Sequence, residues 1–258
     1  MKETNAKNKQ NEQEVPLESL FEQLTNHHRL REDFIKARMT AKKQMEAMVK
    51  KSKNMPEESK PDQYMGSISS GFDQFKIVEK VYEKEMVKIA KQMPLHDWFT
   101  KTNGCGTISL GILLAETGDL SNYANPAKVW KRMGLSVRDG EAEKNKTKGE
   151  NTGYSKRRRM ISHRISSTVV MKKSHYQDIY KERKKYELER DEKGYNKLFV
   201  EANRASMLKH YTAKSNQERI KNNQMPLFVL DLRAHRYMVK RLISDLWGEW
   251  TKQRGINN

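Results

Sequence analysis

The sequence has a single cysteine, Cys105, which excludes an intramolecular disulfide and a multi-cysteine zinc cluster. It also lacks long hydrophobic runs, since no stretch approaches the roughly 18 uncharged apolar residues of a membrane-spanning helix. Its N-terminus has no apolar segment of the roughly 7 to 15 residues that an export signal needs. We therefore expect a cytoplasmic protein of a reducing compartment, without a membrane partner.

Strand patterns are also scarce. No segment alternates apolar and polar residues with the period of two that a half-buried strand requires, whereas apolar residues spaced three and four apart recur along much of the chain. This spacing places apolar side chains on one face of a helix. The sequence therefore predicts an all-α fold.

Positive charge is what the sequence has in excess. Lys and Arg number 51 against 33 Asp and Glu, giving a formal net charge of +18 and a pI of about 9.8. Residues 127–190 alone hold 19 Lys and Arg against 8 Asp and Glu. A pI above about 9 with clustered cations is typical of polyphosphate binders. Solubility alone is a weaker explanation, because a small domain needs a net charge of only about 2 to 8.

The first 93 residues predict a helical arm. Residues 1–15 are polar and lack aromatic side chains, so we expect a disordered lead-in. Residues 16–51 read as one long helix, and residues 75–93 read as a second. The intervening segment, 52–71, is rich in Pro, Gly and Ser and reads as a linker. Residues 16–93 are therefore expected to form a helical hairpin or coiled coil.

A Gly-x-Gly turn opens the predicted second domain, residues 94–254. An apolar helical turn leads into Gly104-Cys105-Gly106, and a strongly apolar helix begins at Thr107. Glycine allows a positive φ and a close approach of the backbone to a ligand. The amides of Gly104, Gly106 and Thr107 would then lie at a helix N-terminus, which suits a phosphate group. The alternative is an ordinary turn between two helices.

Two groups of cations follow this hairpin. Asn125 is predicted to cap a short helix whose exposed side carries Lys128, Lys131 and Arg132. A Gly- and Lys-rich segment, 139–153, is expected to be a flexible loop. The next helix begins with four consecutive cations, which oppose the helix dipole and so favour an anionic partner over simple solvation. These four residues are Lys156, Arg157, Arg158 and Arg159.

Several motifs resemble one known family, the bridge-RNA-guided insertion-sequence transposases with a DEDD nuclease domain. The start of their C-terminal transposase domain is similar to GCGTISLGILLAETGDLSNYANPAKVWKRMGL, and the following helix to GYSKRRRMISHRI. The terminal helix of that domain is similar to AHRYMVKRLISDLW. The family's helical arm, which mediates dimer and guide-RNA contacts, resembles LTNHHRLREDFIKARMTAKKQMEAMV. The resemblance spans roughly residues 17–250 and is strongest over 95–135 and 153–165.

Two departures from this family concern catalysis. Its nuclease domain holds two metal ions on four acidic ligands, and this chain has no matching strand pattern. The family's catalytic Ser-Gly dipeptide corresponds here to Asp139-Gly140, and the nearby Ser136 lies in a different register. We therefore expect no catalytic residue, metal site or cofactor within the chain.

Together these features predict a transposase-type DNA-binding protein that acts in transposition or recombination and is associated with the nucleoid. The resemblance implies a homodimer through the helical arm and leaves a structured guide RNA open as a second partner. One alternative is an active recombinase subunit whose carboxylates come from a separate DEDD nuclease chain. Another is a helix-hairpin-helix DNA repair glycosylase, although Thr107 and Ser109 stand where such an enzyme would carry a catalytic lysine.

Overall fold

The computed structural model describes residues 15–52, 62–138, 141–142 and 154–255. The expected all-α fold is confirmed, with one antiparallel pair of two-residue strands, β1 (Val137–Arg138) and β2 (Glu141–Ala142). The predicted lead-in and most of the predicted loop at 139–153 lie outside the described residues. The helices are α1 (Leu17–Ser52), α2 (Asp62–Lys91), α3 (His96–Thr100), α4 (Thr107–Thr117), the 3₁₀ helix η2 (Leu120–Asn122), α5 (Pro126–Arg132), α6 (Lys156–Val170), α7 (His175–Glu192), α8 (Lys197–His210), α9 (Lys214–Lys221) and α10 (Leu227–Gln253).

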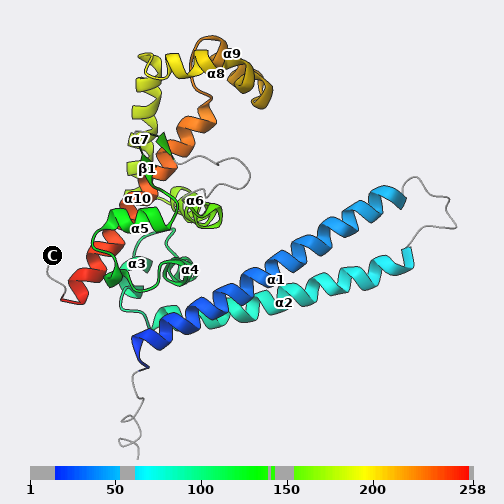
Figure 1. Ribbon diagram of the computed structural model, residues 1–258. Coiled ribbons are helices and arrows are strands. Elements are labelled where there is room, and N and C mark those ends of the chain that lie inside the picture. The colour runs from blue at the N-terminus through cyan, green and yellow to red at the C-terminus, as the bar shows by residue number, and fades with distance from the viewer. Residues whose placement is uncertain (1–14, 53–61, 139–140, 143–153, 256–258) are drawn as a thin grey trace, which may run out of the picture. The chain divides into compact units, whose positions relative to one another are not determined.

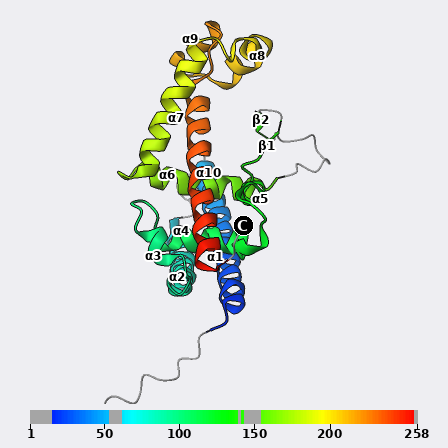
Figure 2. The ribbon, with the colours of Figure 1, turned by 90° about the vertical axis from the view of Figure 1, so that its left-hand side faces the viewer.

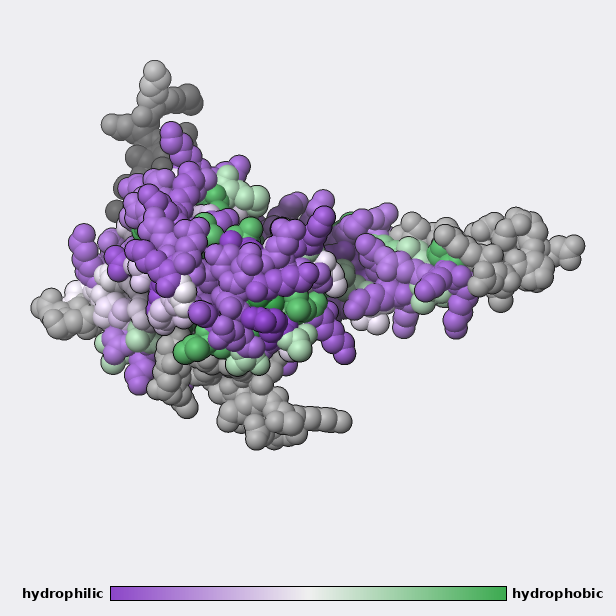
Figure 3. All heavy atoms as spheres, turned by 90° about the horizontal axis from the view of Figure 1, so that it is seen from above, coloured by the Kyte–Doolittle hydropathy of each residue, from purple (hydrophilic) through white to green (hydrophobic). Residues whose placement is uncertain are grey.

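The chain divides into two compact units, each described here by itself. The first comprises Met1–Met93 and Leu110–Asp119, and the second comprises Pro94–Ser109 and Leu120–Asn258. None of the helices within the described residues is both long and apolar enough to cross a membrane. Figure 3 shows that hydrophilic side chains cover most of the face seen from above, with small hydrophobic areas between them.

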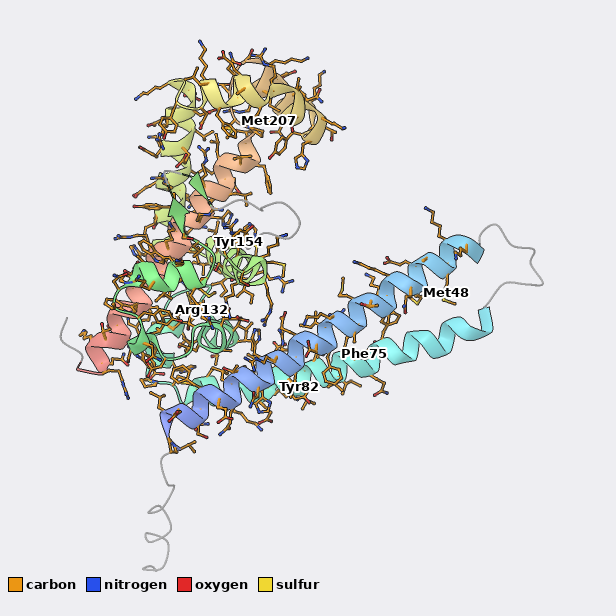
Figure 4. All side chains as sticks on the ribbon, viewed as in Figure 1. Met48, Phe75, Tyr82, Arg132, Tyr154 and Met207 are labelled. Atoms are coloured by element: carbon orange, nitrogen blue, oxygen red, sulfur yellow. The ribbon has the colours of Figure 1, made fainter. Side chains whose placement is uncertain are left out.

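The larger part of the first unit is a long antiparallel hairpin of α1 and α2, which we call the arm (Figure 1). Aromatic rings from both helices meet along it: Phe34 stacks on Tyr82 at 5.7 Å between ring centroids and lies 6.4 Å from Phe75 (Figure 4). The guanidinium of Arg38 forms two hydrogen bonds with the carboxylate of Glu79. Apolar spacing on both helices therefore produces the predicted pairing.

The predicted linker between these helices is too long. Residues 62–71 belong to α2, so Gly66 and Gly71 lie inside a helix and not in a turn. Glycine in a helix interior costs only about 1 kcal/mol relative to alanine. Only residues 53–61 remain between the two described helices.

The C-terminal part of α4 packs with the base of the arm, which the sequence did not indicate. Gly111 lies where an added Cβ would be 3.5 Å from both Leu24 and Ala90, so the helices approach closely. One turn further on, Nε2 of His28 lies 3.0 Å from a carboxylate oxygen of Glu116, and both side chains are buried. The strongly apolar character of α4 thus serves packing within the first unit.

The second unit is organised around α10, which packs against η2, α5, α6 and α7; Figures 1 and 2 both show α7 lying along it. Three indole N–H groups join α10 to residues near η2 and α5. Trp247 donates to the carbonyl of Tyr123 at 3.0 Å, and Trp250 donates to the hydroxyl of Ser121 at 2.8 Å. Trp130 donates to the carbonyl of Lys240 at 3.1 Å. These hydrogen bonds therefore hold α5 and the segment around η2 on α10.

A small separate core lies where α8 and α9 join the N-terminal end of α10. Asp191, which is buried, accepts hydrogen bonds from Arg219 at 2.8 Å, from Asn196 at 2.6 Å and from the backbone N–H of Met225 at 3.1 Å. A buried carboxylate needs such a set of donors. The apolar members of this core are Val200, Met207, Ile220, Met225 and Leu230.

Candidate nucleic-acid interface

The predicted cap of α5 is present. The side chain of Asn125 accepts a hydrogen bond from the backbone N–H of Lys128 at 3.3 Å, and Pro126 occupies the first helical position. The buried Val129 turns one face of the helix toward the core. Lys128, Lys131 and Arg132 are consequently exposed, as the spacing predicts.

The basic helix α6 begins in a similar way. The hydroxyl of Ser155 accepts a hydrogen bond from the backbone N–H of Arg158 at 3.3 Å. The buried side chains of Ile161, Ile165 and Val169 define the core-facing side of the helix. This rotation decides which of the four N-terminal cations face the surface shared with α5.

A cleft of about 710 Å³ lies between the N-terminal end of α6 and the exposed side of α5. It brings together both predicted groups of cations, and Figure 4 labels Arg132 from α5 and Tyr154 immediately before α6. None of the described residues that line it is Asp or Glu. The lining residues are Asn122, Tyr123, Ala124, Lys128, Lys131, Arg132, Tyr154, Ser155 and Arg158. We call this the basic cleft.

The other cations of the predicted run do not line the basic cleft. The guanidinium carbon of Arg159 lies 3.5 Å from the centre of the Tyr154 ring, and its Nε donates to the carbonyl of Gly134. Arg159 therefore joins the end of α5 to α6, and the phosphate contact that the sequence predicted for it stays a prediction. Lys156 and Arg159 face a second cavity, and Arg157 lines neither.

Only one of the two glycines in the Gly-x-Gly turn occupies a position that requires glycine. Gly104 has a φ of +90°, whereas Gly106 is not among the positive-φ residues. A Cβ added at Gly104 would lie 2.8 Å from the Cα of Val169, whereas one added at Gly106 would meet nothing within 4 Å. Glycine is thus required at Gly104 by the close approach of its backbone to the end of α6.

The hairpin and the basic cleft do not form one site. Gly104 packs against the C-terminal end of α6, roughly 20 Å along that helix from Lys156 at 1.5 Å per residue. At the start of α4, the Thr107 hydroxyl lies 3.0 Å from Nε2 of His96. Burial raises the pKa of the Cys105 thiol to about 12, so this cysteine stays protonated. A phosphate contact by Gly104, Gly106 and Thr107 stays a separate prediction.

Two tyrosines of the basic cleft were missed by the sequence interpretation. Burial raises the pKa of the Tyr123 hydroxyl, and the nearby Arg132 and Arg158 partly oppose that rise. Tyr154 lines both the cleft and the second cavity. The only signal for Tyr154 was its place two residues before a run of cations, and Tyr123 gave none.

Of the residues considered for catalysis, only Ser136 lies within the described part of this region. Ser136 is half-buried between Leu135 and β1 and does not line the cleft. Asp139 and Gly140 lie outside the described residues. Within the part of the chain that the structure describes, no three His, Cys, Asp or Glu side chains are grouped so that they could hold a metal ion.

Comparisons of the chain with protein-family models, with curated proteins and with solved structures found no match. The resemblance to the bridge-RNA-guided transposases stays a prediction from motifs.

Proposed function

We propose that the chain binds nucleic acid through its phosphate backbone, with the basic cleft between α5 and α6 as the main contact. The observation that carries this proposal is the convergence of Lys128, Lys131, Arg132 and Arg158 on one cleft whose described lining has no carboxylate. Phosphate contacts from such side chains supply most sequence-independent affinity for DNA.

Two local features of α5 and α6 disfavour cations at these helix positions. Lys128 lies three and four residues before Lys131 and Arg132, and like charges at these spacings destabilise a helix by about 0.2–0.5 kcal/mol per pair. Arg158 lies in the first turn of α6, where the helix dipole disfavours a cation. A bound polyanion would offset both costs, because it places negative charge beside all four side chains.

The transposase-type role belongs to the same proposal. The helical arm of α1 and α2 supports this role, and the basic cleft lies in the region where the family motifs are strongest. We therefore propose a DNA-binding protein of transposition or recombination, with homodimerisation through the arm and a structured guide RNA as a further partner.

The salt dependence of binding tests the phosphate contacts. Affinity for a fluorescein-labelled 20-base-pair duplex, followed by anisotropy, should fall with a log-log slope of about −0.9 per neutralised phosphate. In Lys131→Gln/Arg132→Gln the slope should flatten by about 2, because two contacts are removed.

The control is Lys193→Gln/Lys209→Gln, which removes the same charge from exposed positions outside the cleft. Its slope should stay close to that of the unmodified chain. Equal flattening in both variants would mean that net charge alone drives binding. A slope near zero in the unmodified chain would reject nucleic-acid binding through phosphates.

A further inference from the structure

A second cavity, of about 410 Å³, opens beside the basic cleft between α6 and α10. One side is apolar and consists of Leu135, Met160, Leu232 and Val239. Tyr154 lines both this cavity and the basic cleft. A ligand in one is therefore close to a ligand in the other.

The polar floor of this cavity is already hydrogen-bonded. The hydroxyl of Ser166 lies 2.6 Å from Nδ1 of His235, and Nε2 of His235 lies 3.5 Å from a carboxylate oxygen of Asp231. The ring of His163, which is exposed, lies 5.3 Å from that of His235. Because Ser166, His235 and Asp231 are hydrogen-bonding or ion-pair partners of one another, they fix α6 against α10. The exposed His163 side chain lines the cavity beside them.

The cations that line the cavity have few carboxylate partners among the described residues. Lys156, Arg159 and Arg236 line the cavity, and within the described residues no carboxylate forms an ion pair with Lys156 or Arg236. Burial lowers the pKa of the Arg236 guanidinium, and the neighbouring Arg159 and Arg233 lower it further. A largely buried guanidinium beside other cations is costly unless an anion binds there.

A cavity lined by cations and by apolar side chains suits a ligand in which an anionic group is joined to a flat apolar group. We propose that the cavity binds a single unpaired nucleotide, with its phosphate beside Lys156 and Arg236 and its base against Met160 and Leu232. Its volume falls within the range of about 300–1,000 Å³ that is usual for small-ligand pockets.

The position of the cavity connects this proposal to the proposed function, on which its role in nucleic-acid binding rests. A strand whose phosphates lie in the basic cleft passes Tyr154 and can place one unstacked base in the cavity. Removing a base from a paired duplex costs a few kcal/mol, and the cost is least for a mismatched or single-stranded base. The chain should therefore prefer nucleic acid with an unpaired nucleotide.

Free ligands test the cavity without relying on duplex binding. In isothermal titration calorimetry, adenosine monophosphate should bind at least about tenfold more tightly than inorganic phosphate, because the base adds apolar contact that phosphate lacks. Leu232→Trp, which fills the cavity, should abolish this difference. The matched control is Leu227→Trp, an exposed position at the start of α10 outside the cavity, which should retain it.

Two results would overturn the proposal: equal affinity for phosphate and adenosine monophosphate, or nucleotide binding that survives in Leu232→Trp. Far-UV circular dichroism checks that each variant folds. If Leu232→Trp does not fold, Met160→Trp fills the cavity from an exposed position and takes its place.

A duplex with one mismatched 2-aminopurine then separates this proposal from the proposed function. We expect tighter binding than to the fully paired duplex and a change in 2-aminopurine fluorescence, both lost in the cavity-filling variant. Nucleotide binding without any duplex binding would support the cavity and reject the proposed function. Duplex binding without any preference for the mismatch would reject the unpaired-nucleotide proposal alone.

Discussion

The Nε atom of Arg159 donates a 2.7 Å hydrogen bond to the backbone carbonyl of Gly134. Gly134 has a φ of +71°, and a Cβ added there would lie 3.0 Å from the carbonyl oxygen of Ser155. The end of α5 and the start of α6 are therefore joined through one arginine and one glycine. Arg158, the residue before Arg159, lines the basic cleft instead.

These adjacent arginines should respond differently to the same substitution. Arg159→Gln should lower the free energy of unfolding by about 1–3 kcal/mol, because it removes a charged hydrogen bond and the contact with the Tyr154 ring. Arg158→Gln should change it by less than about 1 kcal/mol and flatten the salt dependence of DNA binding by about 1. Urea unfolding and fluorescence anisotropy measure the two effects, and equal loss of stability in both variants would contradict this assignment.

The two glycines of the hairpin should also differ. Gly104→Ala should cost at least about 2 kcal/mol, since it combines a positive φ with a 2.8 Å contact to the backbone of Val169. Gly106→Ala should be tolerated within about 0.5 kcal/mol, because nothing lies within 4 Å of the added Cβ. Urea unfolding compares them, and each serves as the control for the other. Similar losses would show that the turn is strained at both positions.

Much of the fold could be predicted from local patterns. Apolar residues spaced three and four apart located α1 and most of α2, because helical packing needs an apolar face. The same pattern did not locate the start of α2 at Asp62, where two glycines and several serines suggested a linker. It also gave no sign of α9, whose residues are mostly polar and which contributes only Ile220 to a core.

Less of the candidate site could be predicted, because it depends on contacts between distant segments. The clustering of Lys128, Lys131 and Arg132 follows from helical spacing alone. Which cation of the 156–159 run joins them depends on the rotation of α6 against the core. The division between Arg158 and Arg159 was therefore hidden in the sequence, as was the cavity formed between α6 and α10.

The buried pair of His28 and Glu116 should be important for the first unit. Glu116→Ala should lower the free energy of unfolding by about 2–4 kcal/mol, because it leaves a buried imidazole without this partner, and α4 loses one of its polar links to α1. The control is Glu83→Ala, whose side chain is 42% exposed and pairs with Arg31 at 3.4 Å. It should cost less than about 1 kcal/mol. Urea unfolding followed by circular dichroism distinguishes the two, and equal costs would show that the buried pair contributes no more than a surface one.

Stability should depend on pH through His235. Burial lowers the pKa of its imidazole, an effect opposed by Asp231 and increased by His163 and Lys184. The unfolded chain therefore binds this proton at a higher pH than the folded chain does. The contribution of neutral His235 is present above the unfolded pKa of about 6.5 and is lost as the pH falls through that value toward the lower folded pKa.

The prediction is a decline in the free energy of unfolding from pH 7.5 to about 5, with a slope of up to about 1.4 kcal/mol per pH unit from this one proton. His235→Asn retains an acceptor for the Ser166 hydroxyl and should reduce the decline. His210→Asn, at an exposed position on α8, controls for the loss of one histidine. Urea unfolding at half-unit pH intervals measures the three slopes. If His235→Asn and His210→Asn give the same slope, then another group carries the pH dependence, and the Ser166–His235–Asp231 contact does not couple proton binding to the packing of α6 on α10.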